Sequence, residues 1–270
     1  MIKVISKNTI YRLAILIAII IIAQLMGWNM LRRLIYFPDN NVTKTDQKYL
    51  ERRNFISFES RGYIRKHEAP ETIYMIFHGN AGHAAHRLYI TEGLVEEKAV
   101  LYLAEYPGYG DREGKPTEEN LFQAALSDYQ ALKREYPETA VVVLGESLGS
   151  GVASWLANNA EISKIILVSP FTSLVEVGKH HYFFLPVDAL TPDRFESDLT
   201  LADVGVNKAT PLLIIHGTKD EVVPYSLGEK LFRAYAGPKE FLSLEGYGHN
   251  NLPWNQLDSA LWQSIKSFTK

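Results

Sequence analysis

The sequence predicts an α/β fold with a mostly parallel central sheet and helices on both of its faces. Short runs of Val, Ile and Leu bounded by turn residues alternate with longer helical stretches, and this order is typical of parallel sheets. The apolar runs are continuous rather than alternating, as in strands that are covered on both faces. We expect strands at residues 54–58, 62–66, 73–77, 100–104, 141–144, 165–168, 212–215 and 241–244. We expect helices at residues 118–136, 148–159, 227–235 and 257–268.

The connection after the sixth expected strand is longer than an ordinary loop. It runs from residue 169 to residue 211. A connection of that length inside a compact domain is usually a binding element or a lid. We therefore expect a small lid over about residues 171–207, rich in aromatic side chains.

Composition narrows the class of protein. The chain has 270 residues, of which 46% are hydrophobic and 22% are charged, so it can bury a sizeable core. The formal net charge is -3, whereas nucleic-acid-binding proteins usually carry an excess of basic residues. We therefore expect no nucleic-acid partner. The absence of cysteine excludes disulfides, thiolate metal sites and a cysteine nucleophile.

One stretch near the amino terminus is apolar enough to span a bilayer. Residues 13–31 carry no charge, and as a helix they would be about 28 Å long, close to the hydrocarbon core of about 30 Å. A cleaved signal peptide is the alternative, but residues 23–27 offer a poor cleavage site. We expect a single-pass membrane anchor over residues 1–31, a juxtamembrane linker over 32–51 and one domain over 52–270. The side of the membrane that the domain faces stays open.

A nucleophile is predicted at Ser147. The sequence Gly-Glu-Ser-Leu-Gly follows an expected strand and precedes an expected helix. This is the context in which G-x-S-x-G forces a sharp, strained turn and exposes the serine hydroxyl at the edge of a sheet. The flanking glycines, Gly145 and Gly149, leave room for that turn. The helix amino terminus favours negative charge that develops beside the serine.

The loop after the strand at 73–77 is a candidate for binding an oxyanion. Its sequence, His-Gly-Asn-Ala-Gly over residues 78–82, lets backbone amides approach a ligand closely. In a strand-turn-helix site of this kind, one amide comes from the residue after the nucleophile and another from an early loop. We assign the backbone amides of Leu148 and Asn80, with Ala81 as the alternative to Asn80.

Three histidines near this loop receive non-catalytic interpretations. We expect the His78 side chain to support the loop. His83 and His86 are three residues apart, which suits a pair of metal ligands. Since no carboxylate or third ligand lies near them in the sequence, we interpret both as surface histidines and predict no metal site.

An acid and a base follow the nucleophile in chain order. Asp220 lies in the loop after the strand at 212–215, and His249 lies in the loop after the last strand. The order Ser, then Asp, then His is the one that this kind of site uses. We assign Asp220 to orient the imidazole and His249 to take the proton of Ser147. Glu221 is the alternative acid, and Asp193 and Asp198 in the long connection are weaker candidates.

With these residues placed, the chain resembles the α/β-hydrolases, and within them the bud-emergence-type (Bem-like) serine hydrolases. The resemblance implies an α/β-hydrolase fold and the catalytic residues Ser147, Asp220 and His249. Because similar proteins include membrane-anchored bacterial members, it also implies a bacterial inner-membrane location. One departure is the loop at 111–114, where similar proteins often have a serine. The segments that carry the resemblance are residues 78–82, 106–110, 145–149, 169–173, 193–195, 216–220 and 248–250.

A serine, a histidine and an aspartate with an oxyanion site predict acyl transfer without a cofactor. We expect a serine hydrolase that acts on carboxylic esters or thioesters. Similar proteins act on lysophospholipids or acylated proteins, which implies a small-molecule or lipid substrate. The alternatives are an acyltransferase with the same residues and a binding protein without activity.

Overall fold

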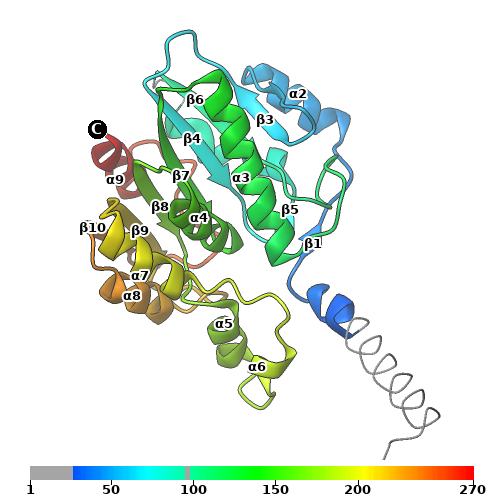
Figure 1. The fold of residues 1–270 in the computed structure, drawn as a ribbon, viewed down its shortest axis with the longest axis vertical. Helices are drawn as coiled ribbons and strands as arrows, with labels where there is room; N and C mark the ends of the chain where they lie inside the picture. Colours follow the sequence, from blue (N-terminus) through cyan, green and yellow to red (C-terminus); the bar gives the residue numbers. More distant parts are fainter. Residues whose placement is uncertain (1–26, 95–97) are drawn as a thin grey trace, which may run out of the picture.

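A single eight-stranded sheet forms the centre of the part of the chain that the structure describes (Figure 1). The structure is a computed structural model, which describes residues 27–94 and 98–270. The strand order is β10-β9-β8-β7-β4-β6-β3-β2. The strands are β2 (Ile56–Ser57), β3 (Gly62–Arg65), β4 (Thr72–Phe77), β6 (Ala99–Ala104), β7 (Ala140–Glu146), β8 (Lys164–Val168), β9 (Leu212–Gly217) and β10 (Lys239–Leu244).

The sheet is mostly parallel, as the sequence predicts. Six neighbouring strands pair in parallel: β10, β9, β8, β7, β4 and β6. The other two strands are antiparallel, since β3 pairs with β6 and β2 pairs with β3 in that orientation. Each expected strand overlaps an observed one, with small differences at the ends. Because β7, β8, β9 and β10 run in the same direction, the loops that follow them meet at one edge of the sheet.

Helices cover both faces of the sheet. Side chains of α3, α4, α7 and α8 share one hydrophobic cluster with the strands, and side chains of α2, η1 and α9 share the cluster on the opposite face. The helices predicted at 118–136, 148–159, 227–235 and 257–268 are confirmed with shifted ends. The helices in these two clusters are α2 (Lys44–Arg52), α3 (Glu118–Glu135), α4 (Leu148–Asn159), α7 (Ser197–Asn207), α8 (Tyr225–Ala234), α9 (Ala260–Thr269) and the 3-10 helix η1 (Ala84–Leu94).

The residues expected to form a linker are structured instead. A short strand, β1 (Phe37–Pro38), pairs in parallel with β5 (Ala81–Gly82), and α2 packs its buried Leu50 against the domain. A capping box between Thr43 and Asp46 begins α2. Residues 39–43 therefore separate β1 from α2, and the segment is folded onto the domain.

The expected lid region contains three helices, α5 (Leu174–His181), α6 (Val187–Leu190) and α7. Phe171 and Phe195, near its two ends, are buried in the core of the sheet. By contrast, the middle of the region carries exposed aromatic side chains at Tyr182, Phe183 and Phe184. The aromatic residues of this region thus divide between core packing and an exposed tip.

The predicted membrane anchor falls largely outside the described residues. Of the stretch 13–31, the structure describes residues 27–31, which belong to a helix that continues to residue 32. Within residues 27–94 and 98–270, none of the helices has the length and apolar character needed to cross a membrane.

Candidate active site

The turn between β7 and α4 has the strained geometry predicted for Ser147. The backbone of Ser147 has φ 51° and ψ -116°, a conformation that side-chain-bearing residues rarely adopt. A Cβ atom on Gly149 would lie 2.1 Å from the carbonyl oxygen of Phe77, and one on Gly145 would lie 2.3 Å from the carbonyl oxygen of Gly149. Only glycine fits at these two positions, so the two glycines allow α4 to begin directly against the sheet.

The predicted oxyanion loop, residues 78–82, lies against Ser147. A Cβ atom on Gly79 would be 3.6 Å from the Cβ of Ser147. The carbonyl of Asn80 accepts hydrogen bonds from the Phe37 amide at 2.9 Å and the Tyr109 hydroxyl at 2.7 Å. Leu148 is the first residue of α4, where backbone amides have no partner inside the helix. The roles of Asn80 and Leu148 stay predictions that this arrangement suits.

Glu146 connects the same loop to the sheet, a contact that the sequence did not indicate. Its carboxylate accepts hydrogen bonds from Arg87 Nε at 3.0 Å, the Tyr89 hydroxyl at 3.2 Å and the Gly79 amide at 3.4 Å. The residue between Gly145 and Ser147 varies freely in the G-x-S-x-G pattern, so the pattern gives no signal for this contact.

The His78 side chain is buried beneath the loop, and both of its ring nitrogens have partners. Its Nδ1 lies 2.7 Å from the carbonyl oxygen of Gly79, and its Nε2 lies 3.2 Å from the carboxylate of Glu105. The same carboxylate accepts the backbone amide of Ala84. These contacts agree with the supporting role expected for His78.

Asp220 and His249 meet although 29 residues separate them. His249 Nδ1 lies 2.8 Å from Asp220 Oδ2, and the Asp220 side chain is fully buried. Although burial opposes ionisation, hydrogen bonds from His216 and His249 and from the Val223 amide hold the pKa of Asp220 well below its usual range. With Nδ1–H donated to the carboxylate, Nε2 of His249 is left free to accept a proton.

His216 is a second imidazole beside the same carboxylate, a contact that the sequence did not indicate. It is fully buried at the end of β9, with Nε2 at 3.0 Å from the Val223 carbonyl and 3.3 Å from Asp220 Oδ2. A histidine that ends a buried strand shows no periodic or spacing signal. The contact between His216 and Asp220 forms because the turn after β9 bends the chain back over the end of that strand.

Glu221, the alternative acid, does not contact the His249 imidazole. Its carboxylate accepts the backbone amide of His249 at 3.4 Å, on the other side of the loop. The one-residue shift from Asp220 therefore directs the two carboxylates differently, and the geometry favours Asp220.

Ser147 and His249 share one edge of the sheet. The Ser147 amide donates to the Val168 carbonyl, and the Thr218 amide to the Leu244 carbonyl, at the ends of neighbouring strands. In the part of the chain that the structure describes, the Ser147 hydroxyl and the His249 imidazole form no hydrogen bond with each other. Such contacts are often long before substrate binds. Two surface hollows, of about 60 and 250 Å³, are lined by other residues.

The departing loop at 111–114 has a structural explanation. Arg112 donates to the buried carboxylate of Asp128 at 2.8 and 3.1 Å and to the carbonyl of Glu105 at 2.7 Å. The loop is therefore tied to α3 and to the end of β6.

The prediction that His83 and His86 are both surface histidines is wrong for His83. His83 is completely buried, whereas His86 is partly exposed. The structure also brings two carboxylates, Asp39 and Asp46, toward them from the amino-terminal segment. Both acids lie far from the histidines in sequence, so spacing gave no sign of the cluster.

Comparison with known proteins identifies the class. A family model described as serine aminopeptidase, S33, matches residues 68–186. The chain belongs to the α/β-hydrolase family: it is 31% identical to alpha/beta hydrolase domain-containing protein 17B of Xenopus laevis over 79% of this chain and 74% of that protein. It is 32% identical to protein Rv2307c of Mycobacterium tuberculosis, with 83% of this chain and 82% of that protein covered.

Two further matches agree with this class. Lysophosphatidylserine lipase ABHD12 of Danio rerio is 30% identical over 73% of this chain, which spans 55% of that protein. A solved α/β hydrolase from Vibrio vulnificus superposes with a TM-score of 0.64 at 20% identity, covering 85% of this chain and 88% of that chain, which shows the fold alone. Together the comparisons support a hydrolase.

Proposed function

We propose that this protein is a serine hydrolase that cleaves carboxylic esters or thioesters through Ser147, His249 and Asp220. The observation that carries the proposal is the 2.8 Å hydrogen bond between His249 and the buried Asp220. It lies at the same sheet edge as the strained turn of Ser147. The order of the sequence motifs further supports a bud-emergence-type member of the family.

In the proposed reaction, Ser147 Oγ attacks the substrate carbonyl while His249 Nε2 takes its proton. Asp220 stabilises the imidazolium that forms. The amides of Asn80 and Leu148 stabilise the negative charge on the carbonyl oxygen. His249 then protonates the leaving group, and an acyl-enzyme remains. His249 then takes a proton from a water molecule, and the oxygen of that water attacks the acyl-enzyme carbonyl. As the bond to Ser147 Oγ breaks, His249 returns the proton to Ser147 Oγ and the carboxylic acid is released.

A lipid or acylated protein is the substrate class that we propose. The tip of the lid region exposes neighbouring aromatic side chains, with Phe183 at 84%, Phe184 at 70% and Tyr182 at 55% exposure. A contiguous exposed apolar patch of this kind usually marks a membrane or partner surface. The Danio rerio relative, named a lysophosphatidylserine lipase, supports the same class.

We further propose a single-pass anchor that holds this lid near a bilayer, in the bacterial inner membrane. The helix at residues 27–32 lies at the same end of the molecule as α5 and α6 (Figure 1). Arg32 in that helix donates to the carboxylate of Asp193 at 2.8 and 3.0 Å, which ties the amino-terminal segment to the lid region. An anchored site meets lipid-borne esters at a high effective concentration.

A fluorophosphonate probe tests the nucleophile. We expect the probe to label the wild type and the control variant Ser163→Ala, and not Ser147→Ala. Ser163 lies before β8 and bonds the Val141 carbonyl, at the opposite edge of the sheet. Equal labelling of wild type and Ser147→Ala would remove Ser147 as the nucleophile.

Hydrolysis of p-nitrophenyl esters tests the acid and the base. We expect His249→Ala and Asp220→Asn each to lower kcat by at least ~10²-fold, as such substitutions do in related sites. Glu221→Gln distinguishes the two candidate acids. We expect it to leave the His249–Asp220 hydrogen bond in place and so to lower kcat much less than Asp220→Asn does. A larger loss in Glu221→Gln than in Asp220→Asn would reassign the acid.

A further inference from the structure

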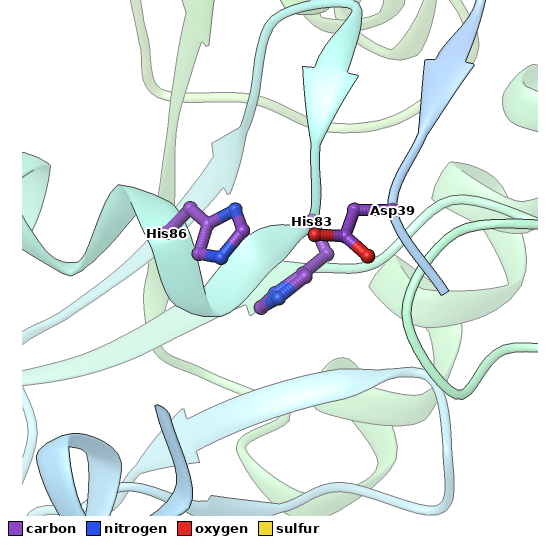
Figure 2. A group of neighbouring side chains, drawn as sticks. All are labelled: Asp39, His83 and His86. Atoms are coloured by element: carbon purple, nitrogen blue, oxygen red, sulfur yellow. The ribbon is translucent and has the colours of Figure 1, made fainter. Parts of the chain in front are cut away.

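Three side chains of types that can bind a metal ion, from two segments of the chain, meet beside β5 (Figure 2). They are Asp39, His83 and His86, and one ligand atom of each lies within 4.8 Å of the other two. Asp39 directly follows β1, and His83 directly follows β5. Because β1 and β5 pair in parallel, their ends carry Asp39 and His83 to the same place.

The state of His83 is the second, independent observation. His83 is fully buried, and neither of its ring nitrogens has a hydrogen-bond partner among the described residues. A buried polar group without a partner is unfavourable and uncommon in folded proteins. Its ring packs on that of His86, with centroids 3.6 Å apart.

A second carboxylate stands close to both rings. Asp46 Oδ2 lies 3.8 Å from His83 Nε2, and Asp46 Oδ1 lies 3.9 Å from His86 Nε2. These separations are too long for hydrogen bonds. The Thr43 amide and hydroxyl hold the Asp46 carboxylate in this position at 2.8 and 2.6 Å. Asp46 or a water molecule can therefore supply a fourth donor.

The donor set suits zinc and its neighbours in the first transition row. Two imidazole nitrogens with one or two carboxylate oxygens are zinc ligands, whereas calcium and magnesium prefer oxygen alone. Donor atoms around a tetrahedral zinc lie about 3.3 Å apart, given metal–ligand distances of about 2.0 Å. The present cluster must draw together slightly, and the partly exposed His86 is free to do so. A Cβ on Gly82 would lie 2.8 Å from His86 Nδ1, so glycine leaves space for that ring.

We propose that Asp39, His83 and His86 bind a divalent ion of the zinc class that ties the amino-terminal segment to the predicted oxyanion loop. The ion would reinforce a connection that already includes the Phe37 amide and the Asn80 carbonyl at 2.9 Å. The role is structural, and it stands whether or not the protein is a hydrolase.

Zinc titration of the full chain, stripped of metal with a chelator and held in detergent, tests the site. We expect calorimetry to give one zinc bound per chain and thermal unfolding to shift upward with zinc. His86→Ala and Asp39→Asn should each weaken binding at least tenfold. Both residues lie at the surface side of the cluster, so these variants should fold. His67→Ala, whose histidine bonds the Ala69 amide in another loop, is the matched control and should bind zinc like the wild type.

Zinc could bind at His249 in the candidate active site instead of at Asp39, His83 and His86. The variant His249→Ala distinguishes these two sites. If the proposal is right, this variant keeps the zinc affinity, and zinc slows amide exchange in residues 37–46 and 81–86. The proposal is overturned if the stripped wild type binds no zinc, if His86→Ala and Asp39→Asn bind it as tightly as the wild type, or if His249→Ala abolishes binding.

Discussion

At the scale of single residues, the candidate site combines backbone strain with a buried charge. Ser147 is held at a positive φ by the tight packing of Gly149 against the end of β4. Asp220 is fully buried yet keeps its charge, because two imidazoles and two backbone amides surround it. Both features lower the stability of the folded state, and packing of the surrounding sheet offsets this loss. Such features are common at functional sites.

The buried charge of Asp220 predicts a pH dependence of stability. Its pKa is lowered in the folded protein, so its ionised form stabilises folding above the unfolded pKa of about 3.9, and this contribution is lost as the pH falls below that value. We expect Asp220→Asn to lower the free energy of unfolding most at about pH 5 to 7 and least at about pH 3. Urea unfolding of both proteins across this range measures the difference.

The exposed Asp258→Asn is the control and should show little change at any of these pH values. A difference between wild type and Asp220→Asn that stays constant from neutral to acidic pH would contradict the assigned electrostatics.

At the scale of elements, the lid region has two parts with different environments. Its ends are fixed to the sheet by the buried Phe171 and Phe195, and Glu118 of α3 accepts the backbone amides of Arg194 and Phe195 at 2.6 and 2.9 Å. Between them, the α5–α6 turn extends away from the sheet (Figure 1) and exposes Phe183 and Phe184. A fixed base with an apolar tip suits contact with a lipid surface.

The apolar tip predicts a selective loss with lipid substrates. We expect the double variant Phe183→Ser with Phe184→Ser to raise KM for esters carried in vesicles by at least about tenfold, because burying part of the two rings is together worth at least about 1.4 kcal/mol. Hydrolysis of a short soluble ester should stay near the wild-type rate. Steady-state kinetics on both substrates make the comparison.

Ile56→Ser with Leu257→Ser is the matched control, since both side chains are exposed outside the lid region, at 57% and 53%. The same KM in the double Phe variant and the wild type on vesicles would remove the tip as a lipid contact.

At the scale of the whole molecule, the amino-terminal segment is part of the folded domain and not a tether alone. Tyr36 is buried, and its hydroxyl and the Arg32 guanidinium both donate to Asp193. Burial, and then the nearby Asp193, raise the pKa of Tyr36 far above its usual range. A segment bonded in this way fixes the distance between the predicted anchor and the lid region.

The predicted anchor gives a test for the complete protein. Because residues 13–31 are uncharged and long enough to span a bilayer, we expect the full chain to stay in the membrane pellet after carbonate extraction. A variant without residues 1–26 keeps every described residue and should be released. A wild-type product found in the soluble fraction and trimmed near residue 27 would indicate a cleaved signal peptide.

The sequence by itself determined the sheet, because buried parallel strands leave continuous apolar runs that need no knowledge of their partners. It also singled out Ser147, Asp220 and His249 as candidates, because this kind of turn chemistry is local and the chain order is fixed. In the structure Asp220 contacts the His249 imidazole, and the catalytic roles of the three residues stay predictions.

Only the tertiary structure decided which distant residues meet. It placed Glu146 against the loop at 78–82 and Asp39 beside His83. It also turned an expected linker into a strand and a helix packed on the domain. Each of these contacts joins segments that lie far apart along the chain, and no local sequence pattern marks them. They form only when packing of the core brings the segments together.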